Sequence, residues 1–216
     1  MNARDAIFAA VGGPTRPADS IAREAAALLD RVPGLRPDRV NGDRAEAFLA
    51  RITSPSIGAT ATRIASLGEA PAAVRAYLET HRLPARVALQ PHARLMGLDW
   101  SGVETHSSIA VDEAAAVLIA PYAVAETGSL VFRSGPDMPV LFAFLPLHCL
   151  VVVDAASVVA WLEDCAAIEA KHPAPRNLNL ITGASGTTDI EGALVRGAHG
   201  PASLHVIFVD PSNPKP

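Results

Sequence analysis

The stretch Leu178–Asp210, LNLITGASGTTDIEGALVRGAHGPASLHVIFVD, decides the fold that we predict for this chain. An apolar run lies at each end, at Leu178–Ile181 and at Leu204–Val209, with the length and branched side chains of strands buried on both faces. Such strands are typical of a parallel sheet covered by helices. Between the runs, Thr188 and Glu191 have the spacing of a capping box, so we expect Thr188 to begin a short helix.

The glycine-rich loop before that helix is a candidate ligand-binding segment. Its candidate residues are Gly183, Ser185, Gly186 and Thr187. A loop between a strand and a helix start presents backbone N–H groups and the positive end of the helix dipole at the carboxyl edge of a sheet. The loop lacks both common nucleotide-binding glycine patterns and contains no lysine. Two interpretations stay open, a site for a small anion or carboxylate and an ordinary turn.

A second candidate segment is Ala125–Val131, AETGSLV, in which Glu126 and Thr127 precede Gly128 at a tight connection. A glycine there can take a positive φ and lets a ligand approach the backbone. Glu126 is therefore a candidate general base or nucleophile, with Thr127 and Gly128 as ligand-binding residues. The alternative is that Glu126 accepts hydrogen bonds from backbone N–H groups and holds the turn.

Three histidines complete the candidate set. His148 comes just before the predicted strand Leu150–Val153, where it can carry a proton, donate to a bound carboxylate, or simply bond a loop carbonyl. His148 and His199, the latter on a Gly-Pro turn, are catalytic candidates beside Glu126. His205, among apolar neighbours, is expected in the core. Their spacing matches no zinc motif, so we predict no metal site.

Three motifs in order resemble one known family. They are the segment Gly183–Asp210, the AETGSLV segment Ala125–Val131, and LPLH at Leu145–His148 followed by an apolar run. Together they resemble the LUD-domain family, the LutC (YkgG-type) lactate utilisation proteins, over about residues 112–210. The chain departs from the family pattern at Ala184, where proline is common, and at Gly186, where a larger residue is usual.

The resemblance implies an α/β fold, a three-layer α/β/α sandwich with a mostly parallel sheet, similar to the NagB/RpiA/CoA-transferase-like group. It also implies an accessory role in oxidising L-lactate to pyruvate with iron–sulfur oxidoreductase partner proteins. The alternative is a stand-alone protein or enzyme that binds a carboxylate, phosphate or CoA-type ligand through the Glu126 and Ser185 loops. An accessory role is favoured because the chain has no dinucleotide fingerprint.

Composition narrows the classes of partner and cofactor. The 216 residues carry a formal charge of −4 and show no basic stripe, which argues against binding to nucleic acid. Cys149 and Cys165 are the only cysteines and lie in apolar patterns, so we expect them in the core. Iron–sulfur clusters need closely spaced sets of thiolates, so we expect no cofactor in this chain and clusters in a partner.

The predicted organisation has three parts, an N-terminal helical arm at 1–56, an α/β domain at 57–210 and a flexible tail at 211–216. In the arm we expect helices from Asp19 or Ser20 to Val32 and at Asp43–Ile52. In the domain, strands of one mostly parallel sheet are predicted at Arg86–Gln90, Leu150–Val153, Leu178–Ile181 and His205–Val209. With no signal peptide and no apolar run long enough to span a bilayer, we expect a cytoplasmic protein. A homo-oligomer is left open.

Overall fold

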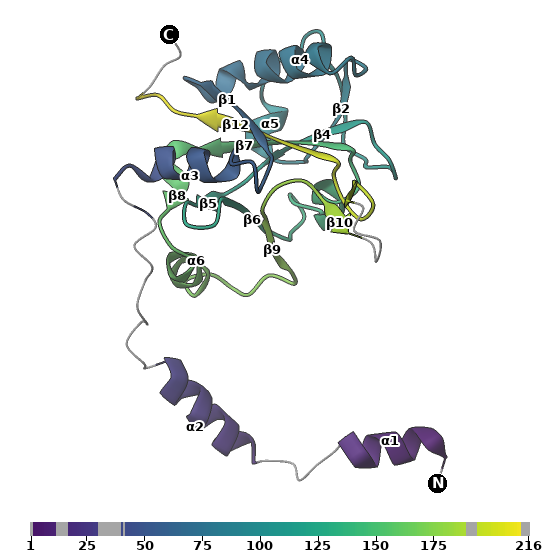
Figure 1. Cartoon of the computed structure of the whole chain (residues 1–216), viewed down its shortest axis with the longest axis vertical. Helices are drawn as coiled ribbons and strands as arrows, with labels where there is room; N and C mark the ends of the chain where they lie inside the picture. The colour runs from purple at the N-terminus through teal and green to yellow at the C-terminus, as the bar shows by residue number, and fades with distance from the viewer. Residues whose placement is uncertain (1, 12–16, 30–39, 41, 189–193, 213–216) are drawn as a thin grey trace. The chain divides into compact units, whose positions relative to one another are not determined.

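A computed structural model describes residues 2–11, 17–29, 40, 42–188 and 194–212. The chain divides into two compact units, Met1–Pro37 and Asp38–Pro216. The first contains helices α1 (Ala3–Val11) and α2 (Ala18–Leu29) (Figure 1). The second unit contains every other element. The predicted end of the first arm helix, at Val32, lies outside the described residues.

A six-stranded sheet forms the centre of the second unit (Figure 1). Its order is β1-β12-β7-β4-β2-β3, and each neighbouring pair is parallel. This confirms the predicted α/β fold with a mostly parallel sheet. The strands are β1 (Thr60–Ile64), β2 (Arg86–Leu89), β3 (Glu104–His106), β4 (Ala115–Ile119), β7 (His148–Asp154) and β12 (Ser203–Val209).

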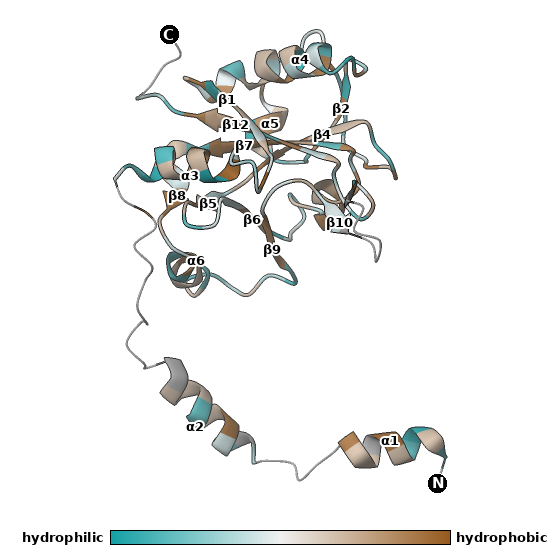
Figure 2. Ribbon diagram, viewed as in Figure 1, coloured by the Kyte–Doolittle hydropathy of each residue, from teal (hydrophilic) through white to brown (hydrophobic). Residues whose placement is uncertain are grey.

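Helices α4 (Ala70–Thr80) and α5 (Ala93–Met96) cover one face of the central sheet. Pro71 stands in the first turn of α4, where its missing N–H costs no hydrogen bond. Val74 and Leu78 of this helix pack against sheet residues such as Leu150. The apolar content of the central strands is visible in Figure 2. A short 3₁₀ turn, η1 (Leu67–Glu69), leads into α4.

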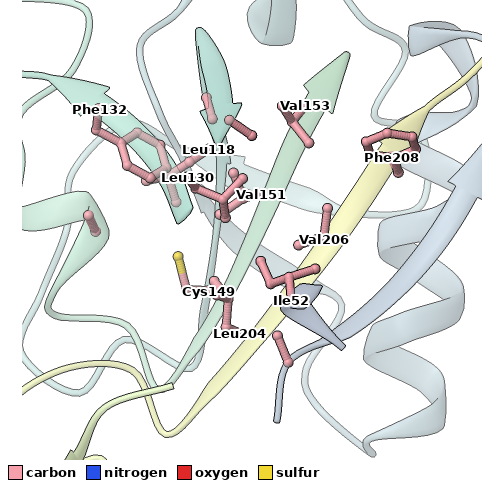
Figure 3. Close-up of a cluster of buried hydrophobic side chains, with 14 of the residues drawn as sticks. Ile52, Leu118, Leu130, Phe132, Cys149, Val151, Val153, Leu204, Val206 and Phe208 are labelled. Carbon is pink, nitrogen blue, oxygen red and sulfur yellow. The ribbon is translucent and has the colours of Figure 1, made fainter. Parts of the chain in front are cut away.

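The opposite face is covered by α3 (Arg44–Ile52) and by a small second sheet. Phe48 of α3 stacks on Phe208 of β12 with ring centroids 5.9 Å apart. Ile52 of α3 lies in the same cluster as Phe208 (Figure 3). Asp43 caps α3 by accepting the N–H of Ala45. Helix α3, which the sequence groups with the arm, thus packs in the core of the second unit.

The small sheet has the order β8-β5-β6-β9, and its members are β5 (Tyr122–Val124), β6 (Ser129–Arg133), β8 (Val158–Val159) and β9 (Leu178–Ile181). Leu130 and Phe132 of β6 join the central core beside Leu118 and Val151 (Figure 3). Helix α6 (Leu162–Glu169) contributes Cys165 to a cluster on the other side of the small sheet. The remaining elements are the 3₁₀ turns η2 (Val140–Ala143) and η3 (Ala155–Ser157) and the hairpin of β10 (Gly186–Thr188) and β11 (Leu194–Arg196).

Three predictions about elements are corrected. Leu178–Ile181 is a strand, but it pairs antiparallel with β6 in the small sheet, and Leu178 and Leu180 are 38% and 43% exposed. Leu178 and Leu180 alternate with the less exposed Asn179 and Ile181, so one face of this strand lies in solvent. Thr188 is no helix cap, because it ends β10 opposite Leu194, and the rest of the predicted helix lies outside the described residues. Its β-branched side chain favours a strand. Helix α6 begins at Leu162, later than Asp154 or Ser157, where the sequence predicts that this helix starts.

In the described part of the chain, no helix combines the length and the apolar content that crossing a bilayer requires.

Candidate functional site

A chain of three hydroxyl groups connects the two candidate loops. Thr127 Oγ1 lies 2.7 Å from Ser129 Oγ, which in turn lies 2.5 Å from Thr182 Oγ1. Ser129 is buried in the first position of β6, and Thr182 directly follows β9. The AETGSLV segment and the glycine-rich loop, far apart in the sequence, therefore meet at one end of the small sheet.

Two glycines let these loops lie close to the end of α3 and to the segment that follows it. Gly128 has φ +69°, and a Cβ there would lie 3.0 Å from the backbone nitrogen of Ile52. Gly183 has φ +88°, and a Cβ there would lie 2.7 Å from the carbonyl oxygen of Ile57. L side chains avoid such φ values, and here the space is also filled. Glycine is therefore required at both positions by packing as well as by backbone conformation.

The glycine-rich loop also meets the turn before β12. The Ser185 N–H donates to the Pro201 carbonyl at 2.8 Å, and the Ser185 carbonyl accepts the Gly197 N–H at 3.0 Å. His199 in this turn is exposed and lines a hollow of about 240 Å³ with Phe144 and Leu147. Ser185 and His199 are thus brought to the same region, while Gly186 and Thr187 pair with β11 in the hairpin.

The loop lies at the amino-terminal edge of the central sheet, which corrects the expectation of the carboxyl edge. Gly183 contacts Ile57, three residues before β1, and Ser185 bonds Pro201, two residues before β12. The reason is the pairing of β9. It pairs antiparallel with β6 in the small sheet and has no partner in the central sheet, so the direction of the central strands does not set the position of its carboxyl end.

Glu126 lies at the start of α6. Its Oε2 accepts the N–H of Leu162 at 3.4 Å, and its own N–H donates to the carbonyl of Ala160 at 3.0 Å. A carboxylate near the first turn of a helix satisfies an N–H group that has no partner within the helix. This geometry agrees with the alternative in which Glu126 holds the turn, and its catalytic role stays a prediction.

His148 belongs to a different group of side chains, on the α4 face of the sheet. Its Nδ1 lies 3.0 Å from the Tyr77 hydroxyl. The Tyr77 ring has its centroid 4.1 Å from that of His81 and 4.5 Å from that of His205. His205 Nδ1 lies 2.7 Å from Thr60 Oγ1. We call Thr60, Tyr77, His81, His148 and His205 the histidine–tyrosine cluster.

Burial lowers the pKa of two histidines in this cluster. His205 is 5% exposed, as predicted for a core residue, and its Nε2 is buried without a hydrogen-bond partner. Burial, with a smaller effect of the nearby His81, lowers the pKa of His205 to about 4 and also lowers the pKa of His148. His205 is therefore neutral near pH 7. Sequence reasoning missed Tyr77 and His81, although their spacing of four residues places them on one helix face.

The sequence predicts one shared cleft for six candidates, and the structure does not bring all of them together: Glu126, Thr127, His148, Ser185, Thr187 and His199. The structure joins Thr127, through Ser129, to the loop that contains Ser185, and brings His199 close to that loop. His148 instead hydrogen-bonds Tyr77 on α4, and the Glu126 carboxylate bonds α6. Among the described residues, no group of three or more His, Cys, Asp and Glu side chains is placed to hold a metal ion. Both cysteines are buried, and burial raises the pKa of Cys149 to about 12.

Replacing Ser129 by alanine is expected to reduce the free energy of unfolding by about 1–2 kcal/mol, because the central hydroxyl of the chain has two partners and no access to water. Urea unfolding of the purified protein measures this loss. Thr182→Ala removes the exposed end of the same chain and is the control, with an expected loss below about 1 kcal/mol. Equal losses in the two variants would contradict this account of the hydroxyl chain.

Comparison with known proteins agrees with the fold and with these loops. Residues 110–209, which include all of the candidate loops, match the family model of the LUD domain. This match covers a little under half of the chain and confirms the resemblance that its motifs indicate. Over 91 residues the chain is 35% identical to lactate utilization protein C of Geobacillus sp. (strain WCH70) and 33% identical to lactate utilization protein C of Bacillus subtilis (strain 168).

Each of these two matches covers 40% of this chain and 38% of the relative, so the similarity spans well under half of either protein. The crystal structure of a DUF162 family protein from Deinococcus radiodurans is similar in fold. It is 22% identical, with a TM-score of 0.56, and the match covers 79% of this chain and 100% of that one. The fold is thus shared with a solved structure.

Proposed function

We propose that this chain acts in lactate utilisation, as a non-redox subunit that works with iron–sulfur proteins in the oxidation of L-lactate to pyruvate. The observation that carries the proposal is the contact between the two LUD-type loops through Thr127, Ser129 and Thr182. These loops lie in the region that matches the LUD domain, and several of the similar proteins are called lactate utilization protein C.

The assignment of the redox step to a partner follows from the chemistry. Oxidation of lactate to pyruvate removes two electrons, which requires a redox centre. The sequence has only two cysteines, and both are buried in the core. Cluster ligation requires closely spaced thiolates, and burial keeps the Cys149 thiol protonated. This chain would then bind, position or assemble, and its free cysteines suit the reducing cytoplasm where we place it.

The test compares the isolated chain with a complex. The purified chain alone is expected to be colourless and inactive with L-lactate, whereas its complex with a cluster-bearing partner is expected to oxidise lactate. An absorption spectrum and a turnover assay measure both properties. Visible absorption together with lactate turnover by the isolated chain, without added partner or cofactor, would contradict the proposal.

Variants in the assembled complex then separate a binding or catalytic role from a scaffold role. Glu126→Gln and Ser185→Ala are made separately, with Glu104→Gln, an exposed carboxylate on β3, as the matched control. Loss of turnover in an intact complex with Glu126→Gln or Ser185→Ala supports a binding or catalytic role for these loops. Full activity in both variants supports a scaffold.

A further inference from the structure

A crevice opens at the carboxyl edge of the central sheet, between β2 and β4. After β2 the chain turns into α5, on the face that α4 also covers, whereas after β4 it turns into β5 and β6 on the opposite face. Neighbouring parallel strands whose connections leave in opposite directions form the point where α/β sheets bind ligands. A cavity of about 390 Å³ lies there, lined by Gln90, Arg94, Pro121, Arg133, Asp137 and Met138, among others.

Gln90 holds this crevice in shape. It is 2% exposed and directly follows β2. Its Oε1 accepts the N–H of Ile119, at the end of β4, and its Nε2 donates to the carbonyl of Asp137, each at 2.7 Å. Both ends of the side-chain amide are therefore satisfied, and they tie the ends of two strands to the segment after β6. A site with such internal bonds is formed before any ligand arrives.

The lining carries charges of both signs. The Arg94 guanidinium pairs with Asp154 at 2.9 Å and is 47% exposed on its side chain. The Arg133 guanidinium pairs with Glu169 and also donates to the carbonyl of Pro173. A guanidinium has more N–H donors than one carboxylate occupies, so Arg94 can hold a second anionic group. Asp137 adds an acceptor to the same lining.

We propose that this crevice binds a small 2-hydroxy acid such as lactate. The carboxylate of the ligand bonds the guanidinium of Arg94, its hydroxyl donates to the carboxylate of Asp137, and its short apolar end lies toward Pro121 and Met138. A simple anion would place its charge beside Asp137 with no hydroxyl to donate, so the lining selects for both groups together. This inference rests on the proposed function and names the ligand of a site outside the LUD-type loops.

The test measures direct binding to the full chain. Ligand-observed NMR titration uses L-lactate as the probe, with acetate, 1,2-propanediol and inorganic phosphate as comparison ligands. L-lactate is expected to bind more tightly than acetate, which lacks the hydroxyl, and than propanediol, which lacks the carboxylate. Absence of lactate binding, or phosphate or acetate binding as tightly as lactate, would overturn the assignment.

Two variants place the ligand. Arg94→Gln is expected to weaken L-lactate binding about 10-fold or more, since it removes a charge-assisted hydrogen bond. Asp137→Asn is expected to weaken the binding of lactate and leave that of acetate unchanged. The control is Arg86→Gln, which removes the same charge at the other end of β2, where the Arg86 side chain is 53% exposed. Lactate affinity unaffected by Arg94→Gln, or reduced equally by Arg86→Gln, would overturn the site.

The binding experiments on the crevice can fail independently of the activity test of the proposed function. A complex that oxidises lactate although the isolated chain binds none would overturn the crevice assignment and leave the role in lactate utilisation intact. A chain that binds lactate in the crevice while its complexes never oxidise it would support the site and contradict the proposed function.

Discussion

Lowering the pH from 7 to 4 is expected to reduce the free energy of unfolding of the second unit by about 3 kcal/mol through His205 alone. In the folded protein burial holds the pKa of this imidazole at about 4, against 6.5 for an ordinary histidine. Below pH 6.5 this imidazole therefore binds a proton in the unfolded chain, whereas in the folded chain it stays neutral until the pH approaches 4. Stability is unaffected above that pH, falls as the pH drops toward 4, and levels off below it.

The surroundings of His205 support this direction. Tyr77 on α4 packs against its ring, and His81, directly after α4, packs against Tyr77. Thr60 on β1 bonds its Nδ1. None of these groups is an anion at neutral pH that would favour an imidazolium, and a protonated His81 would repel one. His148, whose pKa is also lowered by burial and by His81, adds a loss of the same sign.

Urea unfolding at several pH values between 7 and 4 measures the effect. Carboxylates also titrate near the lower end, so the informative quantity is the difference between the wild-type protein and His205→Gln. Glutamine does not titrate, and the decline in stability should be smaller by most of the His205 contribution. His199→Gln, which removes an exposed histidine, is the control and should decline as the wild type does. Parallel curves for all three proteins would refute the assignment.

Replacing Gly183 by alanine is expected to reduce the free energy of unfolding by about 3 kcal/mol or more. Alanine at φ +88° costs roughly 1–2 kcal/mol from the left-handed backbone alone. The new Cβ would also lie 2.7 Å from the Ile57 carbonyl oxygen, so backbone must move, at a cost of about 1–3 kcal/mol as in an overpacked core. Displacement of this loop would disturb the hydroxyl chain that begins at Thr182.

Gly42→Ala is the matched control for this prediction. Gly42 also has a left-handed φ, +84°, but a Cβ there would meet nothing within 4 Å. Its expected loss is therefore the backbone cost alone, about 1–2 kcal/mol. Urea unfolding of both variants isolates the effect of the contact with Ile57. If Gly183→Ala loses no more stability than Gly42→Ala, the close approach of the loop to Ile57 has no energetic consequence.

The sequence predicts β7 and β12 of the central sheet well because both strands are long apolar runs. β7 and β12 are buried along nearly their whole length, as their content of branched side chains indicates. Leu178–Ile181 is too short for such a pattern to tell a central strand from a strand of a second sheet. This segment joins the small sheet because it pairs with β6, a strand that lies far away in the sequence.

The site was harder to predict for the same reason. The motifs identify the two loops, and the structure joins them through Ser129. The edge at which they meet depends on the direction of β9, which no local pattern encodes. The histidine–tyrosine cluster combines side chains from three parts of the chain, and Gln90 acquires its role only when β2 and β4 are neighbours. Such groupings come from topology and cannot be read from spacing.

The place of β12 between β1 and β7 bears on how the protein is made. Thr60 and His205, which pair across β1 and β12, are 145 residues apart, so β1 has no partner in the central sheet until almost all of this sequence has left the ribosome. Until then β1 and β7 expose open edges, which pair readily with other chains. We therefore expect the sheet to close only after translation of β12. A ribosome stalled before Ser203 would hold a nascent chain that depends on chaperones to stay unaggregated.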